Sequence, residues 1–541
     1  MKDRNSQLKE SLGRMTPVKE AKEVHNLPKY DTTNRQGHGA YKIGDELRLI
    51  SMLNTLKIEP QFYRSENETI QELRDLVEKV GLKDPYFLAQ CIVYSRCMGE
   101  GMRSINHLAA ALAAPYFSGQ PWAKRFYSFW NKKLQKGGCI FRPDDMSEIK
   151  DAFVALNKVK LTNPMRKGFA NAIENMDAYS IFKYKKAIIN IANLVHPDVK
   201  VSTATIEVDG KSYKAIDALM KGMSVSADTW EHAQSDAGQA VAQAVKDGKL
   251  SKDKAQEVLK EAKNDNWESL LKDGKLGILA AIRNLRNMMQ SPRSEVIDLV
   301  SNLVSDGDAI RKGKVMPYQM DLAAEVLRTE FNTQYSRQLI NSLEKGLELS
   351  TPNLAEALPG RNLVIIDCSG SMSTRINDSV TKRRMSSRCV DKAALIGAMI
   401  AKSTNADIIR FGSRAEWFKY NLRSSVFDIA RSIASCSMGG TNLASAFNLI
   451  TAENRSYDRI FILSDNECNS GCQAGAYANY IKRVNSPYIY SVDLAAYGTT
   501  SMKNNGKVNY YYGYGQSMFT DIASKEFNPQ MHIDKIRKIE I

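Results

Sequence analysis

Apolar residues in roughly the first 350 positions recur three or four residues apart, the spacing of one face of an α-helix. The segment IQELRDLVEKVGL at 70–82 shows this pattern clearly. Its apolar side chains share one predicted face: Ile70, Leu73, Leu76, Val77 and Val80. Asp84-Pro85 then gives the signal that ends one helix and begins the next. Similar segments follow, and such a succession of short amphipathic helices predicts a helical-repeat array rather than a single bundle.

One stretch of this first part departs from the helical pattern. The sequence TATIEVDGKSYKAI at 203–216 alternates around Asp209-Gly210, and an Asp-Gly pair between alternating runs predicts a β-hairpin. Residues 225–265 are polar and rich in Ala, Lys and Gln, like an exposed pair of helices. We therefore interpret residues 203–265 as an insertion into the array.

The pattern changes after Pro359-Gly360. Short runs rich in β-formers now alternate with segments of helical spacing. The β-rich runs are RNLVIID, ADIIRFGS, RIFILSDNE and PYIYSVDLAAYG. Alternating strands and helices predict a parallel sheet covered by helices on both faces. We expect an α plus α/β chain, with a helical-repeat domain at 1–358 and a doubly wound, Rossmann-like domain at 359–541.

The charge of the chain narrows the choice of partners. Its 541 residues carry a net charge of +15, with 23 basic against 15 acidic side chains from residue 361 onward and 52 against 45 before it. An excess spread over the whole chain favours a polyanionic partner, nucleic acid most often, although a merely basic protein has the same composition. No apolar stretch is long enough to span a membrane, the N-terminus does not resemble a secretory signal, and we expect a cytoplasmic protein.

The β-rich run NLVIIDCSGSMS ends in a carboxylate followed by hydroxyls at alternate positions. Two further polar groups stand where a parallel sheet would bring them close, in GGTN at a helix start and in LSD at a strand end. The candidate metal-binding residues are Asp367, Ser369, Ser371, Thr441 and Asp465. A few hard oxygens around an open position are typical of Mg²⁺. The sequence therefore predicts a site for a divalent cation, with Mg²⁺ as the expected ion.

The same residues are poorly suited to catalysis. A serine nucleophile needs a histidine base, and the only histidine after residue 360 is His532. The chain has no GxxxxGK[ST] loop for nucleotide hydrolysis. A metal-dependent ribonuclease stays as an alternative, but phosphodiester cleavage normally uses several carboxylates and this set is mostly hydroxyls. We expect a site that binds, and a protein that is not an enzyme.

The ordered set DxSxS, GGTN and LSD resembles the metal-ion-dependent adhesion site (MIDAS) of von Willebrand factor A domains, and residues 361–541 resemble such a domain as a whole. The resemblance implies that the first four candidates ligate the ion, directly or through water, while Asp465 contacts those ligands. It also implies that a carboxylate from a partner protein takes the open coordination position.

Phrases of the first part resemble the TROVE domain of the Ro 60 kDa autoantigen family, whose bacterial members share this layout. They occur in order over residues 37–350: GAYKIGDELRLISML, GMRSINHLAAALAA, FRPDDMSEIKDAF, NPMRKGFANAI, KYKKAIINIANLVHPDVK, NWESLLKDGKLGILAAIRNLRNM and IRKGKVMPYQMDLAAEVL. The resemblance implies a ring or horseshoe of HEAT-like repeats closed by the A domain. It also implies binding of small structured non-coding RNAs (Y RNAs) and of the single-stranded ends of misfolded RNAs, in RNA surveillance, processing or stress response. An exonuclease is a possible protein partner, and we expect a monomer.

Cations that stand with Tyr, Asn or His on predicted helices are the candidates for RNA contact. They are Arg103, His107, Arg166, Lys167, Lys183, Lys185, Lys186, His196, Arg283 and Arg286. Each cluster is also compatible with a solvated helix face, and His107 with a structural histidine whose partners are satisfied. The basic run Lys382-Arg383-Arg384, in the polar insert at 373–388, is expected to lie in a loop at the mouth of the metal site.

A second hypothesis gives the chain no RNA role. It would then be a metal-dependent protein-interaction module, with the helical array as a second protein-binding surface. Salt distinguishes the two hypotheses, because RNA binding through phosphates weakens steeply as the salt concentration rises.

Overall fold

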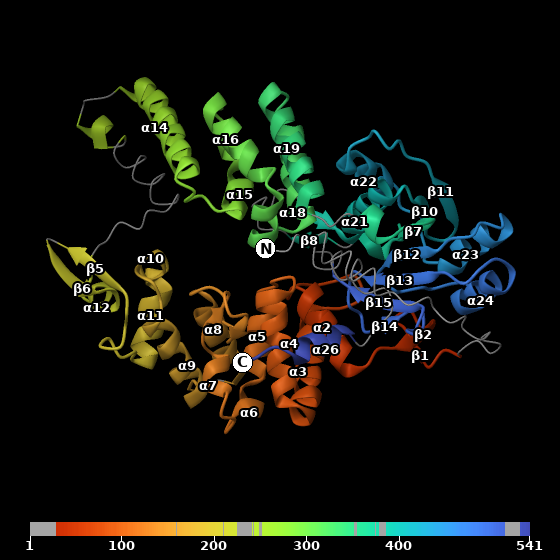
Figure 1. Ribbon diagram of the computed structural model, residues 1–541, viewed down its shortest axis with the longest axis horizontal. Helices are drawn as coiled ribbons and strands as arrows, with labels where there is room; N and C mark the ends of the chain where they lie inside the picture. Colours follow the sequence, from red (N-terminus) through yellow and green to blue (C-terminus); the bar gives the residue numbers. More distant parts are fainter. Residues whose placement is uncertain are drawn as a thin grey trace.

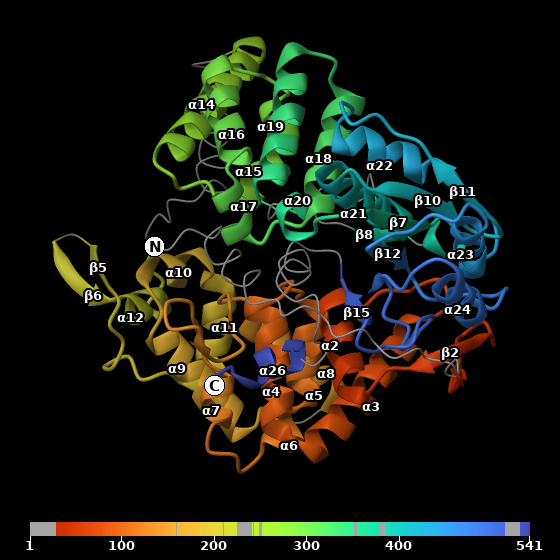
Figure 2. The same ribbon diagram turned by 45° about the vertical axis from the view of Figure 1, so that its right-hand side comes forward.

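The computed structural model describes residues 29–157, 160–208, 210–223, 241, 243–247, 251–350, 354–373, 375–377, 386–513 and 531–541. Its helices follow one another in two arcs, and a large sheet lies beside both (Figures 1 and 2). The first arc runs from α2 (Asp45–Thr55) to α12 (Ala215–Met220) in the lower half of Figure 1, and the second from α14 (Lys252–Lys272) to α19 (Gln334–Ser350) above it. The predicted fold class, a helical-repeat half followed by a doubly wound α/β domain, is confirmed.

The first arc contains short helices, most of them amphipathic. After α2 they are α3 (Glu66–Lys83), α4 (Pro85–Val93), the π-helix η1 (Tyr94–Met98), α5 (Ser104–Leu112), α6 (Ala114–Phe117), α7 (Ala123–Phe126), α8 (Asp145–Asn157), α9 (Asn163–Glu174), α10 (Ala178–Lys183) and α11 (Lys185–Val195). The strands β3 (Trp130–Asn131) and β4 (Lys136–Gly137) pair between α7 and α8.

The face predicted for residues 70–82 is the buried face of α3. Its fully buried apolar side chains are Leu73, Leu76, Val77 and Val80. A capping box sets the start of the helix, because the Ser65 hydroxyl accepts from the Glu68 amide at 3.2 Å and the Glu68 carboxylate accepts from the Ser65 amide at 2.7 Å.

The second arc packs α14 to α19 side by side. Between these two helices lie α15 (Ile278–Met288), α16 (Ser294–Val304), α17 (Gly307–Gly313) and α18 (Pro317–Glu330), and α20 (Leu354–Ala357) follows α19. Helix α18 packs against α21 (Cys389–Thr404) of the α/β half, and this contact joins the second arc to the sheet.

The predicted hairpin is present, with β5 (Thr205–Val208) antiparallel to β6 (Lys211–Lys214). The later part of the proposed insertion at 203–265 differs from the prediction. Helix α14 begins at Lys252 and packs against α16, and the amide of Asn264 donates to the Ser291 carbonyl at 3.0 Å. Residues from 252 onward are therefore an integral part of the second arc.

The main sheet has the order β11-β10-β7-β12-β13-β15, parallel except for the edge strand β11. Its strands are β7 (Asn362–Asp367), β10 (Asp407–Phe411), β11 (Ala415–Phe418), β12 (Arg459–Ser464), β13 (Tyr488–Asp493) and β15 (Val508–Tyr512). Alternate residues of β7 face opposite sides, with Val364 and Ile366 in one core and Leu363 and Ile365 in the other.

Helices cover both faces of this sheet. The first core contains side chains of α21 and α22 (Val426–Ala434), and the second contains those of α23 (Leu443–Ala452) and α24 (Gln473–Arg483). The short elements η2 (Ser371–Ser373), β8 (Arg375–Asn377) and β9 (Ser386–Arg388) follow β7. Strand β7 has β10 on one side and β12 on the other, so the strand order reverses at β7. Doubly wound folds bind ligands at such a switch point.

The two ends of the described chain each lie on the opposite half. Near the N-terminus, β1 (Thr32–Thr33) pairs with β2 (Gly39–Lys42), and β2 pairs with β14 (Thr499–Thr500) of the α/β half. The C-terminal helix α26 (Met531–Arg537) packs against α4, where the Gln90 amide donates to the Arg537 and Ile539 carbonyls at 2.8 and 2.9 Å. Within the described residues, no helix is long and apolar enough to cross a membrane.

Candidate metal centre and nucleic-acid interface

The structure brings the five predicted metal-binding residues to one edge of the main sheet. Strand β7 ends in Asp367, and its parallel neighbour β12 ends just before Asp465. Thr441 lies in the loop that leads into α23. All five side chains, those of Asp367, Ser369, Ser371, Thr441 and Asp465, are at most 4% exposed.

Hydrogen bonds hold Asp367 and the two serines in place. The Ser464 hydroxyl donates to Asp367 Oδ2 at 2.6 Å, and the Ser369 amide donates to Oδ1 at 2.9 Å. The hydroxyls of Ser369 and Ser371 lie 3.2 Å apart. Ser371 also lies close enough to the carboxylate of Asp465 to lower its pKa. The motif therefore forms one connected cluster of oxygens.

Backbone hydrogen bonds bring the loop of Thr441 to the same cluster. The Gly370 amide, between the two serines, donates to the Gly439 carbonyl at 2.9 Å. The Thr441 amide donates at 2.9 Å to Oδ1 of Asn469, which lies in the loop after β12. The three pieces of sequence that predicted the site thus meet at the carboxyl ends of β7 and β12.

Two buried carboxylates lie in this cluster, and neither forms an ion pair with another described residue. Burial raises the pKa of Asp367 to about 7, and the negative charge of Asp465 adds to the rise. Burial also raises the pKa of Asp465. The nearby Glu467 has its pKa raised to about 8 by burial and by Asp465, and its buried Oε1 has no hydrogen-bond partner within the described chain. A bound cation would reduce the repulsion between like charges that are buried away from water.

The donor set fits a hard divalent cation. Two carboxylates balance its charge, and three hydroxyls add neutral oxygens, the ligand chemistry that Mg²⁺ accepts. In the part of the chain that the structure describes, no group of three or more His, Cys, Asp or Glu side chains is arranged to hold a metal. A cation at this edge would therefore need the hydroxyls as ligands.

Sequence reasoning missed two residues that contribute to this edge. Asp493 ends β13, accepts from the Tyr510 hydroxyl at 2.7 Å, and has its pKa raised to about 6 by burial. Its signal was present, because PYIYSVD is another β-rich run that ends in an acid. Tyr63 lies before α3 in the helical half, and Ser371 lies close enough to lower the pKa of its hydroxyl. No local motif marks Tyr63.

Exposed cations gather in the first turns of α9 and α11. They are Arg166, Lys167, Lys185 and Lys186, and none of them forms an ion pair with another described residue. Positive charge near a helix N-terminus opposes the helix macrodipole, so these cations do not stabilise their own helices. Cations without an acidic partner are available to the phosphates of a nucleic acid.

Aromatic rings stand beside these cations. Tyr179 is 48% exposed, and the Lys183 ammonium lies 5.4 Å from its ring centre and 5.9 Å from that of Tyr184. The guanidinium of Arg142 lies 5.7 Å from the Tyr184 ring. His196 is exposed at the end of α11. Rings and cations in this arrangement suit the stacking of unpaired bases.

Arg103 and His107 lie in an ion-pair cluster inside the first arc. His107 is 3% exposed, with Nε2 3.0 Å from Asp145 and Nδ1 2.6 Å from Glu148. Arg103 lies 2.9 Å from Asp144 and 2.6 Å from Glu148. The alternative of a structural histidine fits this geometry, because both ring nitrogens face carboxylates and not solvent.

The candidates on α15 differ from each other. Arg286 forms an ion pair with Glu330 at 2.6 Å, which reduces its attraction for phosphate. Arg283 is exposed. Two other features of the sequence, the run Lys382-Arg383-Arg384 and the side chain of His532, lie outside the described part of the chain.

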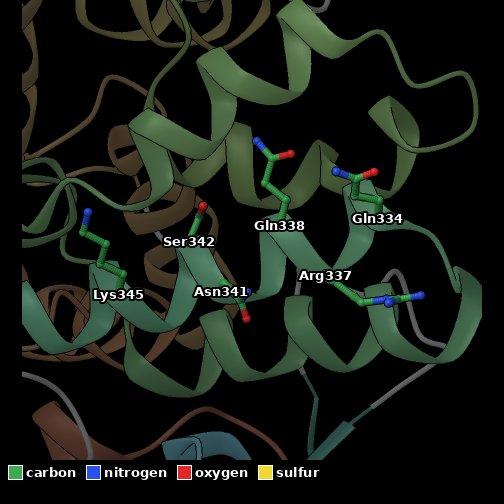
Figure 3. Close-up of a pocket in the computed structure, with 6 residues that line it drawn as sticks. All are labelled: Gln334, Arg337, Gln338, Asn341, Ser342 and Lys345. Carbon is green, nitrogen blue, oxygen red and sulfur yellow. The ribbon is translucent and has the colours of Figure 1, made fainter.

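A polar face of α19 was not predicted (Figure 3). It lines a shallow pocket with Gln334, Arg337, Gln338, Asn341, Ser342 and Lys345. Arg337 and Lys345 are exposed, and neither is ion-paired with a described residue. Amides between two cations can contact both phosphates and bases.

Comparison with known proteins agrees with this architecture. Residues 226–395 match the family model of the TROVE domain, and residues 361–492 match that of the Ro60 vWA domain. The TROVE match thus begins inside the segment predicted as an insertion. The crystal structure of the Deinococcus radiodurans Ro (RSR) protein superposes with a TM-score of 0.54 at 16% sequence identity, over 89% of this chain and 100% of that one. No curated protein matches the chain.

Proposed function

We propose that this chain, a Ro-type protein with a TROVE domain and a Ro60-type von Willebrand factor A domain, is an RNA-binding protein. The observation that carries the proposal is the surface formed by α9, α10 and α11. Four exposed cations stand near the N-terminal ends of α9 and α11, and the ammonium of Lys183 on α10 lies 5.4 and 5.9 Å from the ring centres of Tyr179 and Tyr184. Cations would hold phosphates while the rings stack on unpaired bases.

The RNA we propose is a small structured non-coding RNA of the Y type, together with the single-stranded ends of misfolded RNAs. A net charge of +15 spread over both halves supports a ligand that contacts several elements. The exposed cations on α15 and α19 extend the basic surface to the second arc. The protein would act in RNA surveillance, processing or stress response, without chemistry of its own.

The A domain would supply a second binding function. Mg²⁺ would be held by Asp367, Ser369, Ser371 and Thr441, with Asp465 contacting these ligands. When bound, the ion offers an electrophilic position to a carboxylate of a protein partner, such as an exonuclease. The chain's own residues orient the oxygens and balance the charge.

Binding of a short hairpin RNA, with and without a single-stranded 3′ tail, tests the proposal. The dissociation constant is measured over a salt series, with Mg²⁺ and with a chelator. Tighter binding of the tailed RNA, falling steeply with salt and indifferent to Mg²⁺, is the expected result. Weak binding that ignores both tail and salt would leave the alternative, a Mg²⁺-dependent protein-interaction module.

Variants that remove positive charge test whether the surface formed by α9, α10 and α11 contacts RNA. Lys185→Gln with Lys186→Gln should lower the salt slope of log K by about 1.5 to 2, because two phosphate contacts are lost. Lys79→Gln with Lys83→Gln is the matched control, since it removes the same charge from lysines that already pair with Asp45 and Glu46. Equal effects of the two double variants would contradict the assignment.

A further inference from the structure

The loop that precedes α3 lies against the metal-site edge of the A domain, although it belongs to the helical half. The Arg64 guanidinium donates to the carbonyls of Ala495 and Ala496 at 3.1 Å each, and it lies 5.3 Å from the centre of the Tyr497 ring. The Gln61 amide donates to the Ala495 carbonyl at 3.3 Å. Residues 61–64 are thus fastened to the loop that follows β13.

Tyr63 is the member of this loop that faces the metal-binding residues. Its amide donates to the Tyr497 hydroxyl at 3.4 Å, and the two rings pack edge to face at 5.7 Å. Its own hydroxyl lies close enough to Ser371 for that serine to lower the pKa of Tyr63, and Ser371 lowers the pKa of Asp465 in the same way. Burial raises the pKa of Tyr63, and the charges of Asp465, Glu467 and Asp367 raise it further. The phenol of Tyr63 is therefore within electrostatic reach of the three carboxylates of the site.

The turn between β1 and β2 contacts the same loops. The Arg35 amide donates to Glu467 Oε2 at 2.9 Å, and the Asn34 side chain donates to the Cys468 carbonyl at 2.6 Å. Arg35 also donates to the Tyr63 carbonyl at 3.2 Å. The loop after β12, which begins with Asp465, consequently lies against two segments of the helical half.

We propose that Tyr63 completes the metal site across the domain boundary, so that a divalent cation bound there tightens the contact between the helical half and the A domain. The inference rests on the proposed metal site. The phenol adds one oxygen that holds the cation directly or through water, and the cation removes the repulsion among carboxylates that Tyr63 and Arg35 now face. Loss of the cation loosens residues 61–64 from the loop after β13.

Calorimetric titration of the full-length protein with Mg²⁺ and Mn²⁺ tests the metal side of the inference. Tyr63→Phe should bind either ion about three- to tenfold more weakly than the unaltered protein, the size of one lost neutral contact. Tyr86→Phe is the matched control, because its hydroxyl accepts from the Ile541 amide at 3.2 Å in another contact between distant parts of the chain. Equal affinity of Tyr63→Phe and the unaltered protein would overturn the inference.

Hydrogen exchange measures the coupling. Mg²⁺ should slow amide exchange in residues 61–64 and 495–497 of the unaltered protein, slow it much less in Tyr63→Phe, and leave it unchanged in Asp367→Asn. The same slowing in Tyr63→Phe would overturn the coupling, and no Mg²⁺ binding by the unaltered protein would overturn the metal site itself. RNA binding in the presence of a chelator is measured in parallel, so that failure of the proposed RNA-binding function can be told apart from failure of this inference.

Discussion

The ammonium of Lys314 donates a hydrogen bond of 2.5 Å to the backbone carbonyl of Cys97, which lies 217 positions earlier in the chain. It also donates to the Gly99 carbonyl at 3.1 Å. Carbonyls at the end of a helix have no partner within it, and they favour a cation. Lys314 follows α17 and Cys97 lies in η1. A side chain of the second arc therefore caps the end of a helix in the first arc.

Replacing Lys314 by Met removes both hydrogen bonds and keeps the aliphatic stem. We expect the free energy of unfolding to fall by about 1–3 kcal/mol, because two part-buried carbonyls lose their donor. Amide exchange near residues 97–101 should accelerate. Lys312→Met is the control, since Lys312 is exposed in α17, two residues before Lys314; a loss of stability as large in that variant would contradict the role of the contact.

Asp145 is predicted to be a main determinant of stability in the first arc. It is fully buried, pairs with Arg96 at 2.9 Å and His107 at 3.0 Å, and accepts from the Phe141 and Arg142 amides at 3.0 Å. Asp145→Asn should cost about 3–5 kcal/mol, because it leaves buried cations without their partner. Chemical denaturation measures this loss. A change at the exposed Asp151 of the same helix should have little effect.

The same cluster predicts a pH dependence. Burial lowers the pKa of His107, but Asp145 and Glu148 outweigh it, so the pKa is raised above 6.5. Burial raises the pKa of Asp145, but His107 and Arg96 outweigh it, so the pKa is lowered below 3.8. The contribution of His107 is complete below pH 6.5 and lost as the pH rises through its raised pKa. That of Asp145 is present above pH 3.8 and lost as the pH falls through its lowered pKa.

The destabilisation caused by His107→Gln should therefore be larger at about pH 5.5 than at about pH 8.5. Urea denaturation of both proteins at the two pH values measures the difference. A destabilisation that is equal or larger at the higher pH would contradict the raised pKa of His107.

The polar face of α19 should contribute to RNA binding. Arg337→Gln with Lys345→Gln should reduce the salt slope of log K by about 1.5 to 2 without changing the melting temperature, because both side chains are exposed. Lys79→Gln with Lys83→Gln is again the control, because both lysines pair with acidic side chains. An unchanged slope would limit the RNA surface to the first arc.

Asp367→Asn should change stability in opposite ways with and without metal. Without a cation, removing one of two buried like charges should leave the protein as stable as before or more stable. With Mg²⁺ at about 100 times its dissociation constant, the unaltered protein should gain about 2.7 kcal/mol and the variant nothing. Thermal unfolding with Mg²⁺ and with chelator distinguishes the two; a gain by the variant equal to that of the unaltered protein would contradict the ligand set.

The sequence predicted the elements whose signals are local. β7 and β12 are recognisable because strands buried on both faces are continuously apolar, and the buried face of α3 follows from helical spacing. The clustering of the five candidate residues was predictable for the same reason, since strand ends of a parallel sheet share one edge. Whether they bind a cation stays a prediction.

Contacts between distant segments could not be predicted in this way. His107 looked like a surface residue beside Arg103, because its partners Asp145 and Glu148 come from α8, about 40 residues later. The phrase FRPDDMSEIKDAF held the only hint, a pair of acids at a helix start. Tyr63 faces a site some 300 residues further along, and nothing in its neighbourhood indicates it.

The crossing of the chain ends has a consequence for how the molecule is assembled. Strand β2 is synthesised well before its partner β14, and α26 packs on α4, which comes much earlier in the chain. Neither half can complete its own surface until β14 and α26 have left the ribosome. A single cut between α12 and α14 would leave two fragments that both contacts still hold together, so the fold should persist after the backbone is broken.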